Sequence, residues 1–361
     1  MFELVGVSNE GQTGVRTVRT VDHFATSNNT AKRRTWPTDH NMPAILLSRS
    51  LARVGAVRIG INPARAHVRA SLLARGQNFS SSSSSLASKA STASSDADTR
   101  STSIKVPNIT LYQYAICPFC HKAKALLSYV GIAPSQTIEV NPLTKAELPK
   151  GDYRKVPIAI VDDRQVNGSD DIVQALLDHK YVESTLRSRW KGGELHENEA
   201  THGKIMTMDS FRSSDNSRKW ADFASNDLAG LMYPNICRTL SDSFAAFGYV
   251  DSVSTFSPIQ KGLIKGVGSL AMYMAASRIK KKRNIDDESE ALREAIQKWE
   301  QEGLDGGKKK FGSGQKQPDL GDITVFGTLR SVEGLPAFDM ALATSQVVKE
   351  WYGRMEKEMK S

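Results

Sequence analysis

Two cysteines separated by two residues, Cys117 and Cys120, are the clearest candidates for chemistry in this sequence. The residues before them, 109–116, are β-branched and aromatic, which predicts a strand, and residues 121–130 have a helical composition with an apolar stripe. A cysteine at a junction of strand and helix points its sulfur at unpaired backbone N–H groups and at the positive end of the helix dipole. Both stabilise a thiolate, so we expect Cys117 to be a nucleophile near neutral pH and Cys120 to lie close enough for a disulfide.

A zinc site and a chance occurrence are the two other interpretations of this pair. A zinc knuckle needs a second pair of Cys or His residues at similar spacing. The third cysteine, Cys237, stands alone, and no fourth ligand is spaced to join His121. Three cysteines also cannot crosslink 361 residues, which excludes a disulfide-scaffolded secreted protein. The sequence therefore favours thiolate or redox chemistry and predicts no metal site.

The elements that must position the cysteines run in the order β-α-β-α-β-β-α, beginning with the strand at 109–116. Patterns of apolar residues and turn signals predict strands at 136–140, 156–161 and 164–167, a short helix at 143–148, and a helix that begins at Gly168–Ser169 and runs to about Lys180. A mixed α+β domain of this size fits the region from about residue 104 to residue 182.

The chain beyond about Trp190 lacks strand alternation and is rich in helical stretches. Its aromatic residues are expected to pack in a core rather than to line a ligand site: Trp220, Phe223, Tyr233, Trp299 and Trp351. Asp319 and Asp322 have the spacing of a capping box at the start of an apolar helix.

The most apolar stretch, residues 262–279, contains Lys265 and Arg278. Its uninterrupted run, 266–277, is too short for a membrane span, so we expect a buried helix. The basic run 280–283 follows it at once. Two interpretations of this run stay open: a solvated helix end that the helix dipole favours, and a cationic rim for an acidic ligand or a lipid head group.

The composition is that of a soluble globular protein, with 39% hydrophobic and 24% charged residues. The net charge of +9 is concentrated in the first hundred residues, which hold 13 Lys+Arg and 6 Asp+Glu, whereas the other 261 hold 35 and 33. The body of the chain is therefore nearly neutral, and we expect no nucleic-acid partner.

The N-terminal segment has the composition of an organelle transit peptide. No acidic residue lies between positions 40 and 95, where arginines recur among Ala, Leu, Val and Ser. We predict a targeting segment at 1–79, for the mitochondrion or alternatively the plastid, and a disordered Ser-rich linker at 80–103; an untargeted tail is the other interpretation. Met42 opens the acid-free stretch, so translation starts at Met1 or at Met42.

The motif Cys-Pro-Phe-Cys at 117–120, followed by a strand that begins with Val156–Pro157, resembles the N-terminal domain of glutaredoxins and glutathione transferases. The longer string is similar to the membrane-associated prostaglandin E synthase type 2 family: Leu111-Tyr-Gln-Tyr, Glu139-Val-Asn-Pro, Tyr153-Arg-Lys-Val-Pro and Gly327-Thr-Leu-Arg. The resemblance covers about residues 104–351 and fails over the first hundred residues and near 184–207.

This resemblance implies the fold. An α+β thioredoxin-like domain at 104–182 is expected to be followed by a connection at 183–209 and by an all-helical glutathione-transferase-type C-terminal domain at 210–361.

The resemblance also implies the roles of residues around the motif. Cys117 matches the essential thiol, with Cys120 as the second cysteine of the motif. Tyr114 matches a tyrosine close enough to bond the sulfur, and Phe119 matches a phenylalanine that lines the substrate site.

Glutathione is the ligand that the resemblance implies. The backbone of Val156, before a cis Pro157, would pair with the cysteinyl part of glutathione. Ser169 matches the serine of an acidic–Ser pair that binds the γ-glutamyl group. Gly168 stands where the family has the acidic residue, so the contact to the ammonium group falls to Asp170.

Haem is a second ligand of the family's type member and stays open for this chain. The sequence has no histidine near residues 232–235, where the family has one, and the basic cluster matches only at Arg278 and Lys282. These two side chains are expected at most to form a rim for the carboxylate of a ligand.

The leading hypothesis is therefore a glutathione-binding thiol isomerase of a lipid endoperoxide, of the prostaglandin H to prostaglandin E type. The alternatives are a glutaredoxin-like thiol-disulfide oxidoreductase or glutathione transferase, and a non-catalytic adaptor that binds glutathione or haem. The expected substrate is a lipid endoperoxide or another hydrophobic acid. The resemblance also implies a homodimer and peripheral membrane association.

Overall fold

The computed structural model describes residues 104–191 and 206–360. The predicted targeting segment, the Ser-rich linker and both candidate start methionines lie outside the described residues and stay predictions. Part of the predicted connection, residues 192–205, also lies outside them.

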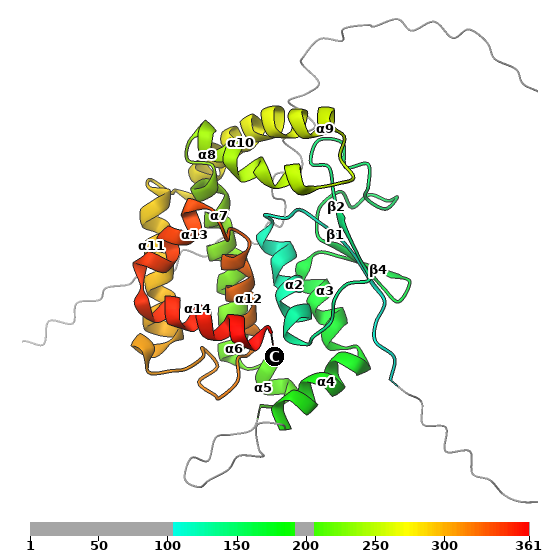
Figure 1. Cartoon of the computed structure of the whole chain (residues 1–361). Helices are drawn as coiled ribbons and strands as arrows, with labels where there is room; N and C mark the ends of the chain where they lie inside the picture. The colour runs from blue at the N-terminus through cyan, green and yellow to red at the C-terminus, as the bar shows by residue number, and fades with distance from the viewer. Residues whose placement is uncertain (1–103, 192–205, 361) are drawn as a thin grey trace, which may run out of the picture. The chain divides into compact units, whose positions relative to one another are not determined.

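A four-stranded mixed sheet with the strand order β2-β1-β3-β4 forms the first module (Figure 1). The central strand β1 pairs in parallel with β2 and antiparallel with β3, and β3 pairs antiparallel with β4. The strands are β1 (Ile109–Gln113), β2 (Gln136–Glu139), β3 (Ile158–Val161) and β4 (Arg164–Asn167). Three helices accompany them: α2 (Pro118–Tyr129), α3 (Ser169–Leu177) and α4 (Lys180–Lys191). This order and topology confirm the predicted thioredoxin-like domain.

The predicted short helix at residues 143–148 is wrong, because this segment forms turns. The side-chain oxygen of Asn141 accepts hydrogen bonds from the backbone N–H groups of Leu143 (2.9 Å) and Thr144 (3.3 Å). An Asn side chain that bonds the following backbone in this way competes with a helix. Lys145 has a φ of 53°, which a right-handed helix cannot accommodate.

The second module is helical, as predicted, and begins with the buried Met206 and Met208. Its α-helices are α5 (Met208–Arg212), α6 (Asp215–Asp222), α7 (Ala229–Ile236), α8 (Leu240–Ala246), α9 (Pro258–Leu263), α10 (Ser269–Arg283), α11 (Glu288–Lys298), α12 (Leu320–Arg330), α13 (Pro336–Thr344) and α14 (Gln346–Glu358). Segments of π- or 3₁₀-helix join several of them: η3 (Phe223–Leu228), η4 (Phe247–Ser252), η5 (Ile264–Gly268), η6 (Trp299–Gly303) and η7 (Asp305–Gly307).

The core of the helical module confirms the predicted aromatic packing and the capping box. Trp299 packs edge-on against Trp220 and Trp351, with ring centroids 4.8 and 5.2 Å apart. At the start of α12, the Asp319 side chain accepts a hydrogen bond from the Asp322 N–H (3.1 Å), and the Asp322 carboxylate accepts one from the Asp319 N–H (3.2 Å). This reciprocal cap satisfies two N–H groups that the first turn leaves unpaired.

Helix α12 lies alongside α2, the helix that carries the cysteine motif (Figure 1). The two backbones approach closely at Gly327: a Cβ atom there would lie 2.6 Å from the carbonyl oxygen of His121 and 3.0 Å from Cβ of Ala125. Only glycine fits this contact, so α12 fixes the position of α2.

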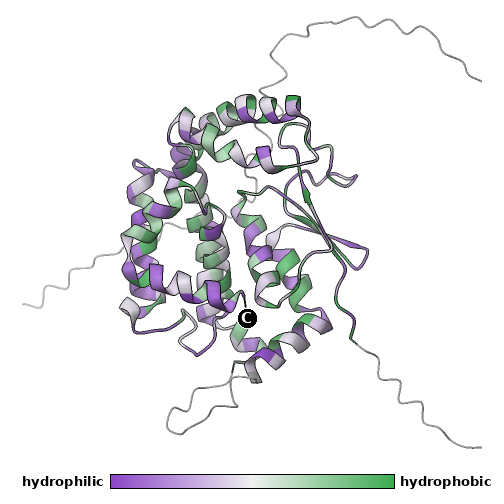
Figure 2. Ribbon diagram, viewed as in Figure 1, coloured by the Kyte–Doolittle hydropathy of each residue, from purple (hydrophilic) through white to green (hydrophobic). Residues whose placement is uncertain are grey.

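The prediction of a buried helix over residues 262–279 is wrong in part. Ala275, Ala276 and Ile279 are buried, but the apolar side chains on the other face are exposed: Leu263, Val267, Leu270, Tyr273 and Met274. The alternation of hydrophobic and hydrophilic residues along α9 and α10 can be followed in Figure 2. Within residues 104–191 and 206–360, no helix is both long and apolar enough to cross a membrane.

Candidate functional site

Cys117 occupies the junction that the sequence predicts, between β1 and the first turn of α2. It is the N-cap residue of α2, with an extended backbone (φ −89°, ψ 117°), and Pro118 follows in the first helical turn. Its own N–H donates to the carbonyl oxygen of Tyr114 (3.1 Å), which closes a turn before the helix. Cys117 and Cys120 are both buried, and neither forms a disulfide.

The pKa values of the two thiols shift in opposite directions. Burial alone would raise the pKa of the Cys117 thiol, but hydrogen bonds from the Cys120 thiol, the N–H groups of Cys120 and Phe119, and the Tyr233 hydroxyl lower that pKa overall. Burial and the neighbouring Cys117 raise the pKa of the Cys120 thiol well above its ordinary value. Cys117 is therefore the more readily ionised thiol of the pair, and Cys120 is a donor that favours its thiolate form.

Tyr233 is a site residue that the sequence analysis assigned to core packing. Its hydroxyl hydrogen bonds with the Cys117 sulfur, although it lies on α7 and 116 positions further along the chain. Burial and the two sulfurs raise the pKa of this phenol well above its ordinary value, so it stays a donor. No local pattern indicates a contact over such a separation.

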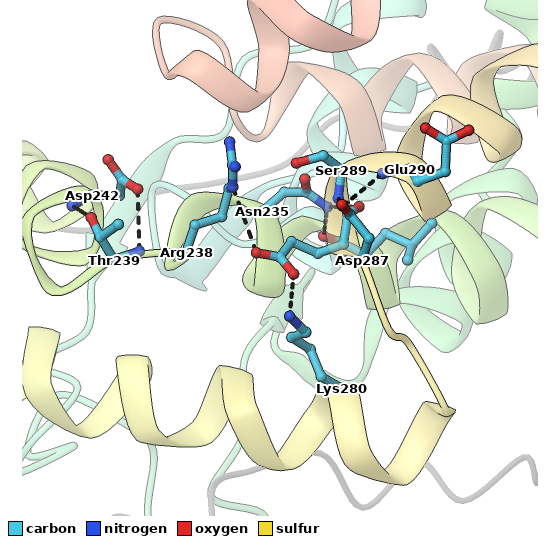
Figure 3. A network of polar contacts seen from close by, with 10 residues as sticks. Asn235, Arg238, Thr239, Asp242, Lys280, Asp287, Ser289 and Glu290 are labelled. Atoms are coloured by element: carbon cyan, nitrogen blue, oxygen red, sulfur yellow. Dashed lines mark hydrogen bonds and ion pairs between the residues drawn. The ribbon is translucent and has the colours of Figure 1, made fainter.

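A polar network holds the end of α7 in place (Figure 3). The side-chain amide of Asn235, two residues after Tyr233, donates to the backbone carbonyl oxygens of Leu231 (2.9 Å) and Glu288 (2.8 Å). The Glu288 carboxylate in turn bonds with Lys280 of α10 and lies 3.5 Å from Nε of Arg238. The first lysine of the basic run 280–283 thus ties α10 to α11.

Tyr114 and Phe119 both lie beside the thiols. Burial, followed by the charges of Cys117 and Cys120, raises the pKa of Tyr114, so its phenol is protonated at neutral pH. Phe119 is half-buried in the first turn of α2, and its N–H group is one of the donors to the Cys117 sulfur.

The residues expected to bind glutathione come together at the start of α3. The peptide bond between Val156 and Pro157 is cis, and the Pro157 carbonyl oxygen accepts a hydrogen bond from the Gly168 N–H (2.9 Å). Gly168 has a φ of 92°, a conformation that glycine adopts without strain. Ser169 is buried as the first residue of α3.

Asp170 is held by a buried cation that the sequence analysis did not find. Nζ of Lys122, on α2, lies 2.5 Å from Oδ1 of Asp170 and 2.5 Å from Oγ of Ser225 on η3. The sequence pattern places Lys122 on an ordinary helix and gives no sign of its burial.

Arg278 and Lys282 are exposed on α10. In the described part of the chain, neither side chain has a hydrogen bond or ion pair with the residues around Cys117.

The described residues form no metal-binding cluster. No group of three or more His, Cys, Asp or Glu side chains in residues 104–191 and 206–360 could hold a metal ion. The two histidines in these ranges are already engaged: Nε2 of His121 lies 2.7 Å from the Ala115 carbonyl oxygen, and Nε2 of His179 lies 3.1 Å from Oδ2 of Asp162. Both Nε2 atoms are therefore occupied and would not ligate a haem iron.

Comparisons with known proteins agree with this geometry. Residues 111–185 match the family model described as glutathione S-transferase, N-terminal domain. Prostaglandin E synthase 2 of Mus musculus is 32% identical over 278 residues, which cover 69% of this chain and 70% of the mouse protein. The protein of the same name from Danio rerio is 33% identical over 286 residues, 73% of each chain. Glutaredoxin 3 of Escherichia coli K12 is 36% identical over 67 residues, 18% of this chain and 81% of the glutaredoxin.

Proposed function

The chain belongs to the prostaglandin E synthase 2 family of the glutathione-transferase superfamily, and from this premise we propose that it is a glutathione-dependent thiol enzyme that isomerises a lipid endoperoxide. The observation that carries the proposal is the environment of Cys117. Its buried sulfur is surrounded by donors that outweigh the cost of burial and lower its pKa. A buried thiolate is a soft nucleophile suited to the weak O–O bond.

The isomerisation needs no net oxidant or reductant. The Cys117 thiolate attacks one endoperoxide oxygen, so an S–O bond forms while the O–O bond breaks, and the other oxygen leaves as an alkoxide. Loss of the proton from the ring carbon then turns its C–H electron pair into the π bond of a ketone, which breaks the S–O bond and returns the thiolate. The alkoxide takes up a proton and becomes the hydroxyl group. The donors from Cys120 and Tyr233 stabilise the sulfur anion at the start and at the end.

Glutathione is proposed to bind beside Cys117, between the cis peptide bond of Val156–Pro157 and the start of α3. The Val156 backbone pairs with its cysteinyl part, and Ser169 with the free N–H groups of α3 holds the γ-glutamyl carboxylate. Asp170 takes the ammonium group: its side chain is 66% exposed, and Lys122 contacts only its Oδ1 atom. Bound glutathione supplies a second thiol next to the reacting oxygen atoms.

The substrate side is proposed to include Phe119, which is half-buried and lies two residues after Cys117 in the chain. Arg278 and Lys282, both exposed on α10, stay proposed only as contacts for the carboxylate of an acidic substrate.

The proposal is tested by incubating the purified chain and glutathione with the endoperoxide. Wild type should form the ketone product faster than Cys117→Ser, whose hydroxyl is not ionised at neutral pH. Equal yields from wild type and Cys117→Ser would refute the proposal.

A second candidate function, thiol-disulfide exchange, is favoured by the free and neighbouring Cys117 and Cys120 thiols. Dithiol reduction of a disulfide requires Cys120 as the resolving thiol, whereas isomerisation does not. Cys120→Ser should therefore abolish dithiol reduction and retain isomerase activity, because serine still provides a donor to the Cys117 thiolate. Deglutathionylation by a single thiol needs its own assay. Saturable glutathione binding without any turnover in these assays would favour a non-catalytic adaptor.

Location and assembly are also proposals. A fusion of residues 1–103 to a fluorescent protein tests import into the mitochondrion, with the plastid as the alternative. Light scattering of the full chain tests the proposed homodimer, and sedimentation with phospholipid vesicles tests peripheral membrane association.

A further inference from the structure

Ala115, two residues before Cys117, is held on both sides by side chains that the proposed reaction does not use. Its N–H donates to Oε1 of Glu139 at 2.8 Å. Its carbonyl oxygen lies 2.7 Å from Nε2 of His121, which donates because a carbonyl oxygen only accepts. Ala115 belongs to the turn that begins with Tyr114 and ends with Cys117. These contacts therefore fix the backbone conformation of the turn that leads into Cys117.

Glu139 connects this turn to three other elements. Its Oε2 atom accepts a hydrogen bond from the side-chain amide of Gln113 on β1 (3.2 Å). The hydroxyl of Tyr249, on η4 of the helical module, is a further donor, and Lys124 of α2 contributes a positive charge. The carboxylate therefore contacts the turn before the thiol and the helical module at the same time.

The charge of Glu139 also acts on the thiol pair and on two phenols. It contributes to the raised pKa of the Cys120 thiol, which follows mainly from burial and from Cys117. It also contributes to the raised pKa values of Tyr114 and Tyr249, for which burial is the main cause. An ionised Glu139 thus keeps Cys120 protonated, as the donor that the Cys117 thiolate needs.

We propose that Glu139 is a positioning residue for the thiol chemistry, which fixes the turn before Cys117 and couples that turn to the helical module through Tyr249. The inference rests on the thiol role of Cys117 in the proposed function, but it does not depend on which substrate that thiol attacks.

A dependence on pH follows from this arrangement. Burial raises the pKa of the Glu139 carboxyl from 4.5 to about 7, against the lowering effects of Ala115, Gln113, Lys124 and Tyr249. Glu139 changes charge near neutral pH, so the reactivity of Cys117 should change there as well as at the pKa of its own thiol.

The experiment measures the rate at which iodoacetamide alkylates Cys117 in the full chain between pH 5 and pH 9, by mass spectrometry of the Cys117 peptide. Wild type should show an inflection near pH 7 that Glu139→Gln lacks, because the amide keeps an acceptor for the Ala115 N–H but carries no charge. Glu139→Ala, which lacks the acceptor, should slow alkylation at pH 7 about tenfold, and Glu139→Gln should restore most of that rate.

Glu147→Gln is the matched control. Glu147 is another partly buried carboxylate that accepts a backbone hydrogen bond, from the N–H of Asn141 (2.9 Å), and it is also close enough to Tyr114 to affect its pKa. This variant also removes one negative charge, but it leaves the hydrogen bonds of Ala115 in place. It should therefore retain the wild-type profile of alkylation rate against pH.

Tyr249→Phe tests the coupling without altering the carboxylate. Because the Tyr249 hydroxyl lowers the pKa of Glu139, its removal should move the inflection to higher pH. The inference is overturned by a Glu139→Gln profile that superimposes on wild type, or by an inflection that does not move in Tyr249→Phe. Alkylation requires no endoperoxide, so a chain that shows this profile and yet forms no ketone product would refute the proposed function alone.

Discussion

Nζ of Lys122 lies 2.5 Å from Oδ1 of Asp170, although the lysine side chain is 2% exposed and the aspartate side chain 66% exposed. The buried cation on α2 thus fixes an exposed carboxylate at the start of α3. Its second partner, Oγ of Ser225 on η3, belongs to the helical module. One side chain therefore links the thiol helix, the proposed glutathione site and the second module.

Replacement of Lys122 by methionine should weaken glutathione binding about tenfold, because Asp170 loses the contact that orients it. The unfolding midpoint should change little, since methionine fills a similar volume and a buried ion pair contributes little net stability. Isothermal titration with glutathione measures the affinity.

Asp170→Asn, alone and combined with Lys122→Met, completes a double-mutant cycle. The two losses of affinity should be far from additive if Lys122 acts through Asp170. Wild-type affinity in Lys122→Met, or additive losses in the double variant, would contradict this role.

Tyr233→Phe should raise the pKa of Cys117, because the phenol hydrogen bond is one of the contacts that lower it. The loss of a hydrogen bond to a charged group predicts a fall of about tenfold in the alkylation rate of Cys117 below neutral pH. The readout is the pH profile of alkylation. Tyr352→Phe is the control, since Tyr352 packs against Phe326 and Phe338 in the core, and it should leave this profile unchanged.

His121 should make the fold sensitive to acid. Burial and the nearby charges of Lys124 and Arg330 lower the pKa of His121 from 6.5 to about 3, so the folded chain holds it neutral. A group whose pKa is lowered on folding adds stability above its unfolded pKa, and this stability is lost as the pH falls from 6.5 towards 3.

The variant His121→Gln cannot take up this proton, and its amide can still donate to the Ala115 carbonyl oxygen. Its urea unfolding midpoint should therefore fall less steeply than that of wild type between pH 6.5 and pH 4. Parallel pH profiles for the two proteins would show that His121 is not the responsible group.

Asp322 should be among the most sensitive positions for stability. Its buried carboxylate accepts hydrogen bonds from the N–H groups of Gly312 (2.7 Å), Ser313 (3.0 Å) and Asp319 (3.2 Å), and from Nε1 of Trp351 (2.9 Å). Asp322→Ala leaves these donors unpaired, which should lower the free energy of unfolding by about 3–5 kcal/mol.

Urea unfolding of Asp322→Ala, with exposed Asp286→Ala as the control, measures this loss. Asp286→Ala should behave like wild type. A loss under about 1 kcal/mol for Asp322→Ala would contradict the importance assigned to the network.

Local sequence was sufficient for the features that depend on near neighbours. The strand before Cys117, the helix after it and the capping box of Asp319 and Asp322 each follow from residues a few positions apart. The helix predicted at 143–148 failed because its composition is helical but the Asn141 side chain bonds the backbone that would start it.

The groups that complete the site were beyond local reasoning. Tyr233, Glu139 and Lys122 acquire their roles from partners on other elements, and Lys122 and Ser225 are 103 positions apart. Their residue types give no hint, because a tyrosine in a helix or a lysine after a cysteine motif is ordinary until the fold shows what lies opposite.

Gly327 lets the backbone of α12 rest directly on α2. The thiol-bearing half of this chain therefore has, on that side, a face that is covered by α12 and is not suited to contact with water. Cutting the chain after residue 191 would leave Ala125 and its buried neighbours facing water, and the excised half should aggregate. The thiol-bearing domain should therefore depend on the helical module to stay in solution.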